Sequence, residues 1–260
     1  MFLPAVSVMV GAFKSNSNHW TFANISTLFH DPYRHAYVES IEVSGVTALL
    51  GGVIGLAVAY AVVREHTPRW LRSVITTFSG VAANFGGIPL AFAFIATFGT
   101  LGIVTTFLRN QLHFDLIAHF QLFTKTGVEF VYLYFQIPLM ILVIAPALDG
   151  LRREWREAAS NLGGSSLHYW RYVGIPVLMP SLLGAVILLF GNAFAAYATA
   201  YALTSGVVPL VPLVIGAYYT GNVLSNPHLA QALAFGMFVV LAVMMAIYIP
   251  LQRRSARWVR

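Results

Sequence analysis

Residues 153–166 read REWREAASNLGGSS, a polar stretch between two apolar segments that are each long enough to cross a membrane. The Glu, Arg, Ala and Leu residues of its first part favour a helix. Gly163 suits a left-handed helix end, and Ser165 or Ser166 can cap a second short helix. Pro176 marks the start of the next apolar segment. The stretch therefore predicts a helix, a sharp turn and another helix, held in water by a chain that is otherwise apolar.

The rest of the chain has the composition of a membrane protein. Of its 260 residues 58% are hydrophobic and only 9% are charged, whereas soluble domains carry about 25% charged residues. The mean hydropathy is +0.74. We expect an all-α, polytopic membrane protein with one transmembrane domain over residues 1–260, and with the polar hairpin loop at about 149–176.

Five apolar segments reach the length of about 20 residues that a membrane helix needs. They are 41–63, 74–98, 128–148, 175–203 and 229–251. Residues 1–13 are apolar but too short to span, and no small-residue cleavage pattern follows them. We expect them to be a first transmembrane helix that lacks its N-terminal half, which gives about six transmembrane helices.

Glycine and proline interrupt several of these segments. The residues concerned are Gly51, Gly52, Gly55, Gly86, Gly87, Pro89, Pro138 and Pro146. Small residues allow helices to pack closely in lipid, and proline bends a helix because it removes a hydrogen bond. Either close packing or hinges around a gated path explains them, and the sequence leaves both open.

Lys and Arg predict the orientation. With six helices, eleven of the fifteen basic residues fall in the loops at 64–72, 152–171 and 253–260, and Lys14, Arg34, Arg109 and Lys125 fall on the other side. Cytoplasmic loops carry the excess of Lys and Arg. Both termini and the polar hairpin are therefore expected in the cytoplasm, and the basic residues beside apolar runs do not indicate nucleic-acid binding.

Several kinds of chemistry have no residues to carry them. The chain has no cysteine, which excludes disulfides, thiolate metal sites and cysteine nucleophiles. Lys14 and Lys125 are the only lysines, and neither ends a phosphate-binding G-x-x-x-x-G-K-[ST] loop. Every histidine falls in a loop or at its edge. We expect no catalytic residue, no metal site and no cofactor in this chain, so any ATP must bind to another subunit.

The polar hairpin resembles a motif of a known family, the inner-membrane permeases of binding-protein-dependent ABC importers. Their pattern is E-A-A, three residues, G, nine residues, then I-x-L-P. Here Glu157-Ala158-Ala159 is followed after three residues by Gly163, and after nine more by residues 173–176, VGIP. Val and Ile replace the Ile and Leu of the pattern. The resemblance covers most of the chain.

This resemblance implies that the loop is the coupling helix of an importer. Glu157, Ala158, Ala159 and Gly163, with Pro176 behind them, would form the contact with ABC ATPase subunits that bind ATP and magnesium. The other expected partners are a second permease subunit in a probable heterodimer, a periplasmic or lipid-anchored substrate-binding protein, and membrane lipid. The resemblance implies the bacterial inner (plasma) membrane as the location. For an isolated E-A-A triplet, a solvated loop without a partner would be the simpler interpretation.

Within this family the chain resembles the spermidine/putrescine branch, through residues 131–140, VYLYFQIPLM, and 192–200, NAFAAYATA. Permeases for iron, thiamine or aminoethylphosphonate are similar and remain alternatives. Polyamines are cations that aromatic faces can bind. The candidate translocation-path residues are Tyr132, Tyr134, Gln136, Asn192, Tyr197 and Tyr201. Each of them is equally explained as a packing or interfacial residue.

Three carboxylates near expected outer helix ends, Glu39, Glu42 and Glu129, fit either hydrated helix ends or an outer vestibule that attracts a cation. Two rival functions were weighed against the importer. An ion-gradient-driven secondary transporter requires intramembrane carboxylates or inverted repeats, and neither is evident. An integral-membrane enzyme would require a catalytic constellation that the sequence does not show.

Overall fold

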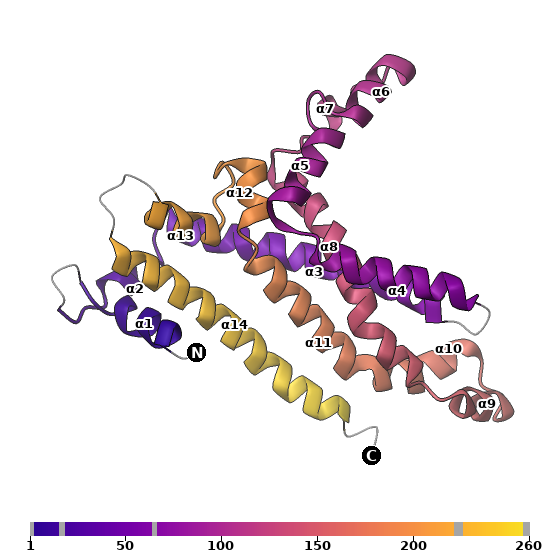
Figure 1. The fold of residues 1–260 in the computed structure, drawn as a ribbon. Coiled ribbons are helices and arrows are strands. Elements are labelled where there is room, and N and C mark those ends of the chain that lie inside the picture. The colour runs from indigo at the N-terminus through magenta and orange to yellow at the C-terminus, as the bar shows by residue number, and fades with distance from the viewer. Residues whose placement is uncertain (1–2, 16–18, 64–66, 221–225, 257–260) are drawn as a thin grey trace. The chain divides into compact units, whose positions relative to one another are not determined.

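The computed structural model describes residues 3–15, 19–63, 67–220 and 226–256, and these are almost entirely helical (Figure 1). A single isolated β-bridge joins Lys14 and Trp20. The α-helices in chain order are α1 Leu3–Ala12, α2 Ala23–Thr27, α3 Tyr33–Val63, α4 Arg69–Asn84, α5 Gly87–Phe98, α6 Ile103–Leu112, α7 Leu116–His119, α8 Lys125–Asp149, α9 Arg153–Asn161, α10 Ser166–Tyr169, α11 Ile175–Phe194, α12 Ala198–Thr204, α13 Val211–Thr220 and α14 Pro227–Ala256.

Five helical stretches of the described residues are long and apolar enough to cross a membrane. They are Tyr33–Val63, Gly87–Leu112, Lys125–Asp149, Ser166–Phe194 and Pro227–Gln252. This confirms the all-α, multi-pass fold and the expected number of long segments. The first segment, α1, is apolar but has only 10 residues. Residues 64–66 and 257–260, which carry part of the basic loops used for the orientation, lie outside the described residues.

One predicted segment, 74–98, is wrong as a single helix. Helix α4 ends at Asn84, and α5 begins only at Gly87. Gly86 is extended, and Gly87 has a φ of +73°, a backbone conformation that no residue of a right-handed helix adopts. The membrane-length stretch instead runs from Gly87 to Leu112. In α4 the apolar residues share the helix with Arg, Ser and Thr, so it is amphipathic.

The predicted segment 175–203 is also divided. Helix α11 ends at Phe194, and Tyr197 precedes the short helix α12. Thr199 of α12 bonds back to the left-handed turn at the start of α5: the Gly87 amide donates to the Thr199 hydroxyl at 2.8 Å, and that hydroxyl lies 3.3 Å from the Gly87 carbonyl oxygen. The two helix breaks are therefore joined by hydrogen bonds through Thr199.

The contacts of the chain group it into two compact units. Unit 1 comprises Met1–Val46, Gly86–Val131 and Asn192–Val243, and unit 2 comprises Thr47–Phe85, Tyr132–Gly191 and Met244–Arg260. Helices α3, α8, α11 and α14 each contribute one part to each unit.

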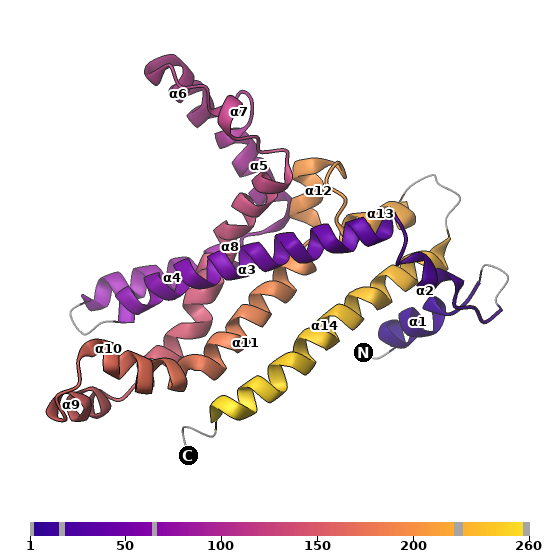
Figure 2. The same ribbon diagram turned by 180° about the vertical axis from the view of Figure 1, so that it is seen from behind.

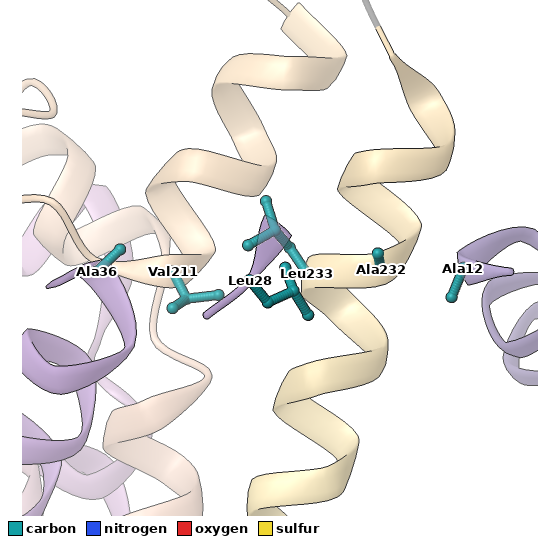
Figure 3. Close-up of a cluster of buried hydrophobic side chains, with 6 residues drawn as sticks. All are labelled: Ala12, Leu28, Ala36, Val211, Ala232 and Leu233. Carbon is teal, nitrogen blue, oxygen red and sulfur yellow. The ribbon is translucent and has the colours of Figure 1, made fainter. Parts of the chain in front are cut away.

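Unit 1 has a small apolar core between short and long helices. Figure 3 shows its fully buried members, which come from α1, α3, α13 and α14 together with one residue that follows α2. They are Ala12, Leu28, Ala36, Val211, Ala232 and Leu233. A second group in this unit is aromatic: the rings of Phe94, Phe98 and Phe120 each lie edge-on to Phe130, with centroids 5.3–5.6 Å apart.

Unit 2 is built on close contact between α3 and α8. Gly51 and Gly55 are buried and lie one helical turn apart on α3. A Cβ atom at Gly55 would lie 2.5 Å from the Cβ of Met140 and 2.8 Å from the carbonyl oxygen of Ile137. At Gly51 it would lie 2.7 Å from the Cβ of Gln136. The pair is thus a G-x-x-x-G packing face, and for these two glycines the packing interpretation of the sequence applies.

Candidate functional site

The polar stretch forms a helical hairpin that follows α8 in unit 2 (Figures 1 and 2). Its first arm, α9, is amphipathic, and none of its residues is buried. Arg153 and Glu157 face one another across one turn, with Arg153 Nε donating to Glu157 Oε1 at 2.9 Å. The Glu157 side chain is 60% exposed, so this pair is a surface ion pair worth about 0.3–0.5 kcal/mol.

The turn of the hairpin is fixed by backbone hydrogen bonds around Gly163. This residue has a φ of +75°, as the sequence predicted for a left-handed helix end. Its amide donates to the Ser160 carbonyl at 2.9 Å, and the Gly164 amide donates to the Ala159 carbonyl at 2.9 Å. These two bonds form a Schellman motif, which satisfies the last carbonyl groups of α9 and reverses the chain.

The second arm begins at the predicted cap and continues into the membrane segment. The Ser165 hydroxyl accepts from the His168 amide at 3.3 Å and so caps α10. A π-helical turn, Trp170–Gly174, joins α10 to α11, and Pro176 is the second residue of α11. The helical stretch therefore runs without a break from Ser166 to Phe194.

Aromatic packing fixes the returning arm against α3. Tyr169 is buried, and the Trp170 ring lies edge-on to Tyr60 of α3 with centroids 5.2 Å apart. The returning arm is therefore packed against α3 at the base of the hairpin.

The exposed tip carries apolar residues that the sequence reading did not select. Leu162 is 89% exposed and Leu167 is 76% exposed, one on each side of the glycine turn. Ala158 is exposed beside them, and Ala159 is half-buried. Leu162 and Leu167 are thus two exposed apolar residues in an otherwise polar hairpin. These residues could have been selected from the sequence as the two leucines that flank a Gly-Gly turn in an otherwise polar stretch.

Three of the candidate path residues lie in unit 2, on α8. Tyr132 and Gln136 are fully buried, and Tyr134 is half-buried with its ring 6.3 Å from that of Phe85. Gln136 Nε2 donates to the Leu189 carbonyl of α11 at 2.9 Å. Tyr132 and Gln136 therefore contribute to helix packing in this structure, and their place in a translocation path stays a prediction.

The other three lie in unit 1. Asn192 is exposed, Tyr197 is half-buried, and Tyr201 is 50% exposed. The rings of Tyr197 and Tyr201 are stacked, with centroids 5.4 Å apart and an interplanar angle of 15°. Tyr197 also packs closely over Gly216 of α13. The two tyrosines form one aromatic face, which is suited to bind a cation or to contact lipid.

Two of the three outer carboxylates, Glu39 and Glu42, form ion pairs with the same lysine. Lys125 Nζ lies 2.9 Å from Glu39 Oε2 and 2.6 Å from Glu42 Oε2, which joins the start of α8 to α3 within unit 1. Glu129 lies one turn after Lys125 on α8. Counted by formal charge, the three carboxylates outnumber Lys125, and Glu39 also lies 3.8 Å from the imidazole of His35. Among the described residues no group of three or more His, Cys, Asp or Glu is arranged to hold a metal ion.

The comparisons of this chain with known proteins all indicate the same family. A profile described as "Binding-protein-dependent transport system inner membrane component" matches residues 51–260. The chain is 26% identical over 215 residues to "Probable sulfate transport system permease protein cysT" of Nephroselmis olivacea, which covers 82% of this chain and 72% of that protein. It is 23% identical over 254 residues to "Spermidine/putrescine transport system permease protein PotB" of Haemophilus influenzae, which covers 95% of this chain and 87% of that protein.

Solved structures show the same fold. A bacterial ABC transporter involved in the import of the acidic polysaccharide alginate has a chain that superposes with a TM-score of 0.74 at 15% identity, over 98% of this chain and 90% of that chain. A second structure is described as the alginate transporter in complex with an alginate pentasaccharide-bound periplasmic protein. Its TM-score is 0.72 at 16% identity, over 98% of this chain and 88% of that chain.

Proposed function

The chain belongs to the family of binding-protein-dependent transport system inner membrane components, and from this premise we propose how it works within an ABC importer. As a multi-pass permease subunit it forms part of the path for a small solute. The solute is delivered by a substrate-binding protein, and the work is done by separate ATPase subunits. The ion-driven secondary transporter considered as an alternative does not agree with the family.

One observation carries the coupling role: the exposed hairpin tip is joined through a continuous helix to α11. In the proposal, Glu157, Ala158, Ala159 and Gly163 contact a groove of the ATPase, and Leu162 supplies an apolar anchor. When ATP binding brings two ATPase subunits together, the hairpin moves with them as a rigid body. The π-helical turn and Pro176 pass that motion to α11, and the importer then changes between its inward-open and outward-open states.

The proposed assembly has four kinds of subunit. Two ATPase subunits hold ATP and magnesium, since this sequence has no phosphate-binding loop. A second, related permease completes the path as a heterodimer. The solved complex of the alginate transporter with its periplasmic protein supports a binding protein as the delivering partner. The hairpin and both termini face the cytoplasm in this proposal, with the inner membrane lipid around the apolar helices.

For the solute we propose a small polyamine-like cation. The support comes from unit 1, where Glu42 and Glu129 outweigh the charge of Lys125 and where the Tyr197–Tyr201 face can receive an ammonium group. Sulfate is the main competing solute, because a sulfate permease is as similar in sequence as a spermidine/putrescine permease. Iron, thiamine and aminoethylphosphonate permeases remain further possibilities within the same family.

The charge change Glu42→Gln with Glu129→Gln tests the solute class. Measured in proteoliposomes that contain the complete importer and its binding protein, the initial rate of spermidine uptake should fall roughly tenfold, because the local attraction of cations is lost. Asp115→Asn is the matched control: it removes an exposed carboxylate of unit 1 that pairs with Arg109 at 3.7 Å, and it should leave uptake unchanged.

Two results would contradict the polyamine assignment. Spermidine uptake that is unaffected by the double change would show that these carboxylates do not attract the solute. Transport of sulfate but not of spermidine by the unaltered importer would replace the cation with an anion, while leaving the coupling role of the hairpin intact.

A further inference from the structure

A cavity of about 350 Å³ lies in unit 2 where the hairpin leaves the membrane helices. Its rim is basic: Arg152, Arg153 and Arg156, at the start of α9, all line it. The volume is within the range of roughly 300–1,000 Å³ that small-molecule sites occupy. Guanidinium groups bind phosphate oxygens through planar, bidentate hydrogen bonds, so a rim with three arginines is suited to an anion of this kind.

The opposite wall is apolar and aromatic. Val63 near the end of α3 and Leu148 near the end of α8 supply aliphatic surface, and Tyr60 and Trp170 supply two rings in edge-on contact. The cavity therefore has a charged side and an apolar side. A ligand that fits both sides has an anionic head and an adjoining hydrocarbon part.

Nearby acidic groups do not neutralise the rim. Asp149 also lines the cavity, but its carboxylate is bound by Arg72 of α4. Among the ion pairs of the described residues, Glu157 engages Arg153, through the surface pair described above. Arg152 and Arg156 thus remain as the cations without an acidic partner among the ion pairs of the described residues.

The position of the cavity indicates which anion is available. It lies where the long apolar helices α3 and α8 end, at the level where phospholipid headgroups meet a membrane protein. In the orientation of the proposed function, on which this inference rests, the cavity faces the cytoplasmic leaflet. This leaflet is rich in anionic lipids, and basic pockets between helices on that side bind their headgroups. We propose that this cavity binds the phosphodiester headgroup of an anionic phospholipid, with Arg152 and Arg156 on the phosphate and the apolar wall along the first part of the acyl chains.

The occupant would link the lipid to the coupling hairpin. The arginines lie at the start of α9, whereas the opposite wall comes from α3, α8 and Trp170 of the returning arm, so a bound headgroup would brace the start of α9 against the membrane helices and the returning arm. Binding of the lipid itself involves this chain alone and does not depend on which solute the importer carries.

Native mass spectrometry of the full-length chain tests the site directly. The chain is purified from membranes that contain both phosphatidylglycerol and phosphatidylcholine, and the amount of phosphatidylglycerol that stays bound is measured. Arg152→Gln with Arg156→Gln should weaken retention about 25-fold, from roughly fivefold for each hydrogen-bonded contact with the phosphate that is lost. The control Arg69→Gln with Arg171→Gln removes the same charge outside the cavity and should retain the lipid. Arg152→Lys with Arg156→Lys should also retain most of it.

A second variant tests the site if the Arg152→Gln, Arg156→Gln chain fails to insert into the membrane. Val63→Trp fills the cavity without changing any charge, and it should also lower retention of the lipid. A parallel arm adds millimolar inorganic phosphate to the chain in phosphatidylcholine alone.

Three results would overturn the proposal. If the Arg152→Gln, Arg156→Gln variant and the Arg69→Gln, Arg171→Gln control lost equal amounts of phosphatidylglycerol, the lipid would be held by the diffuse positive potential of the surface and not by the cavity. Phosphate binding that depends on Arg152 and Arg156, without preference for phosphatidylglycerol, would mean a free anion. If the Arg152→Gln, Arg156→Gln variant retained the lipid but no longer associated with the ATPase, the two arginines would bind an acidic group of the ATPase instead.

Discussion

A chain that carries Glu157→Lys and Gly163→Pro should insert into the membrane normally but take up no solute and co-purify with no ATPase. Proline fixes φ near −65°, whereas Gly163 has a φ of +75° and its amide bonds the Ser160 carbonyl. The turn therefore opens, at a cost of roughly 1–3 kcal/mol in strain alone. Lysine at 157 adds a cation beside Arg153 and reverses the charge that the ATPase meets, and loss of such an ionic contact costs about 2–5 kcal/mol.

Graded variants separate the turn from the charge. Gly163→Asn should retain most of the uptake, because asparagine tolerates a left-handed backbone better than other residues with side chains. Gly163→Ala should lie between Asn and Pro. The measurements are solute uptake in proteoliposomes and the amount of ATPase that co-purifies with the chain. Normal uptake by the Glu157→Lys, Gly163→Pro double variant would remove the coupling role from this hairpin.

The second large effect concerns the contact between α3 and α8. Gly55→Ala should lower the thermal stability of the detergent-solubilised chain strongly, since the new Cβ would overlap the Ile137 carbonyl oxygen and the Met140 side chain. Overpacking of this kind costs about 1–3 kcal/mol, and more where backbone is involved. The two helices would have to move apart, so uptake should fall as well.

Gly45→Ala is the matched control, because it is the same change on the same helix. No atom lies within 4 Å of a Cβ built at Gly45, so the change should be neutral or slightly stabilising through the higher helix propensity of alanine. Thermal unfolding followed by tryptophan fluorescence measures both variants. Equal midpoints for Gly55→Ala and Gly45→Ala would show that α3 and α8 do not pack at Gly55.

The hairpin was predictable from sequence because its signals are local. A left-handed glycine, a serine cap and a helix-favouring run act within a few residues of one another, and all three appear where expected. The exposure of Leu162 and Leu167 is a different kind of fact, since it depends on which neighbours fold back over them. In a membrane protein an isolated leucine carries no local sign of whether it faces lipid, core or water.

The breaks in the membrane segments were harder to predict for a related reason. Residues 74–98 are apolar enough to be counted as one span, and Gly86, Gly87 and Pro89 were noted only as interruptions. What fixes the break is the bond from the Gly87 amide to Thr199, which is 112 residues away in the chain. Similarly, the burial of Gln136 depends on the Leu189 carbonyl on another helix. Partners at such separations leave no periodic pattern in the sequence.

The central claim is that the tip of the hairpin contacts the ATPase, and cysteine cross-linking tests it most directly. The chain has no native cysteine, so Leu162→Cys introduces a single reactive thiol at the exposed tip. With a short thiol-to-amine cross-linker in the assembled importer, this thiol should join to the ATPase subunit in high yield. Val207→Cys, at a position that is 79% exposed but lies in unit 1, should give no such product. Absence of the product at position 162, or an equal yield at position 207, would contradict the account.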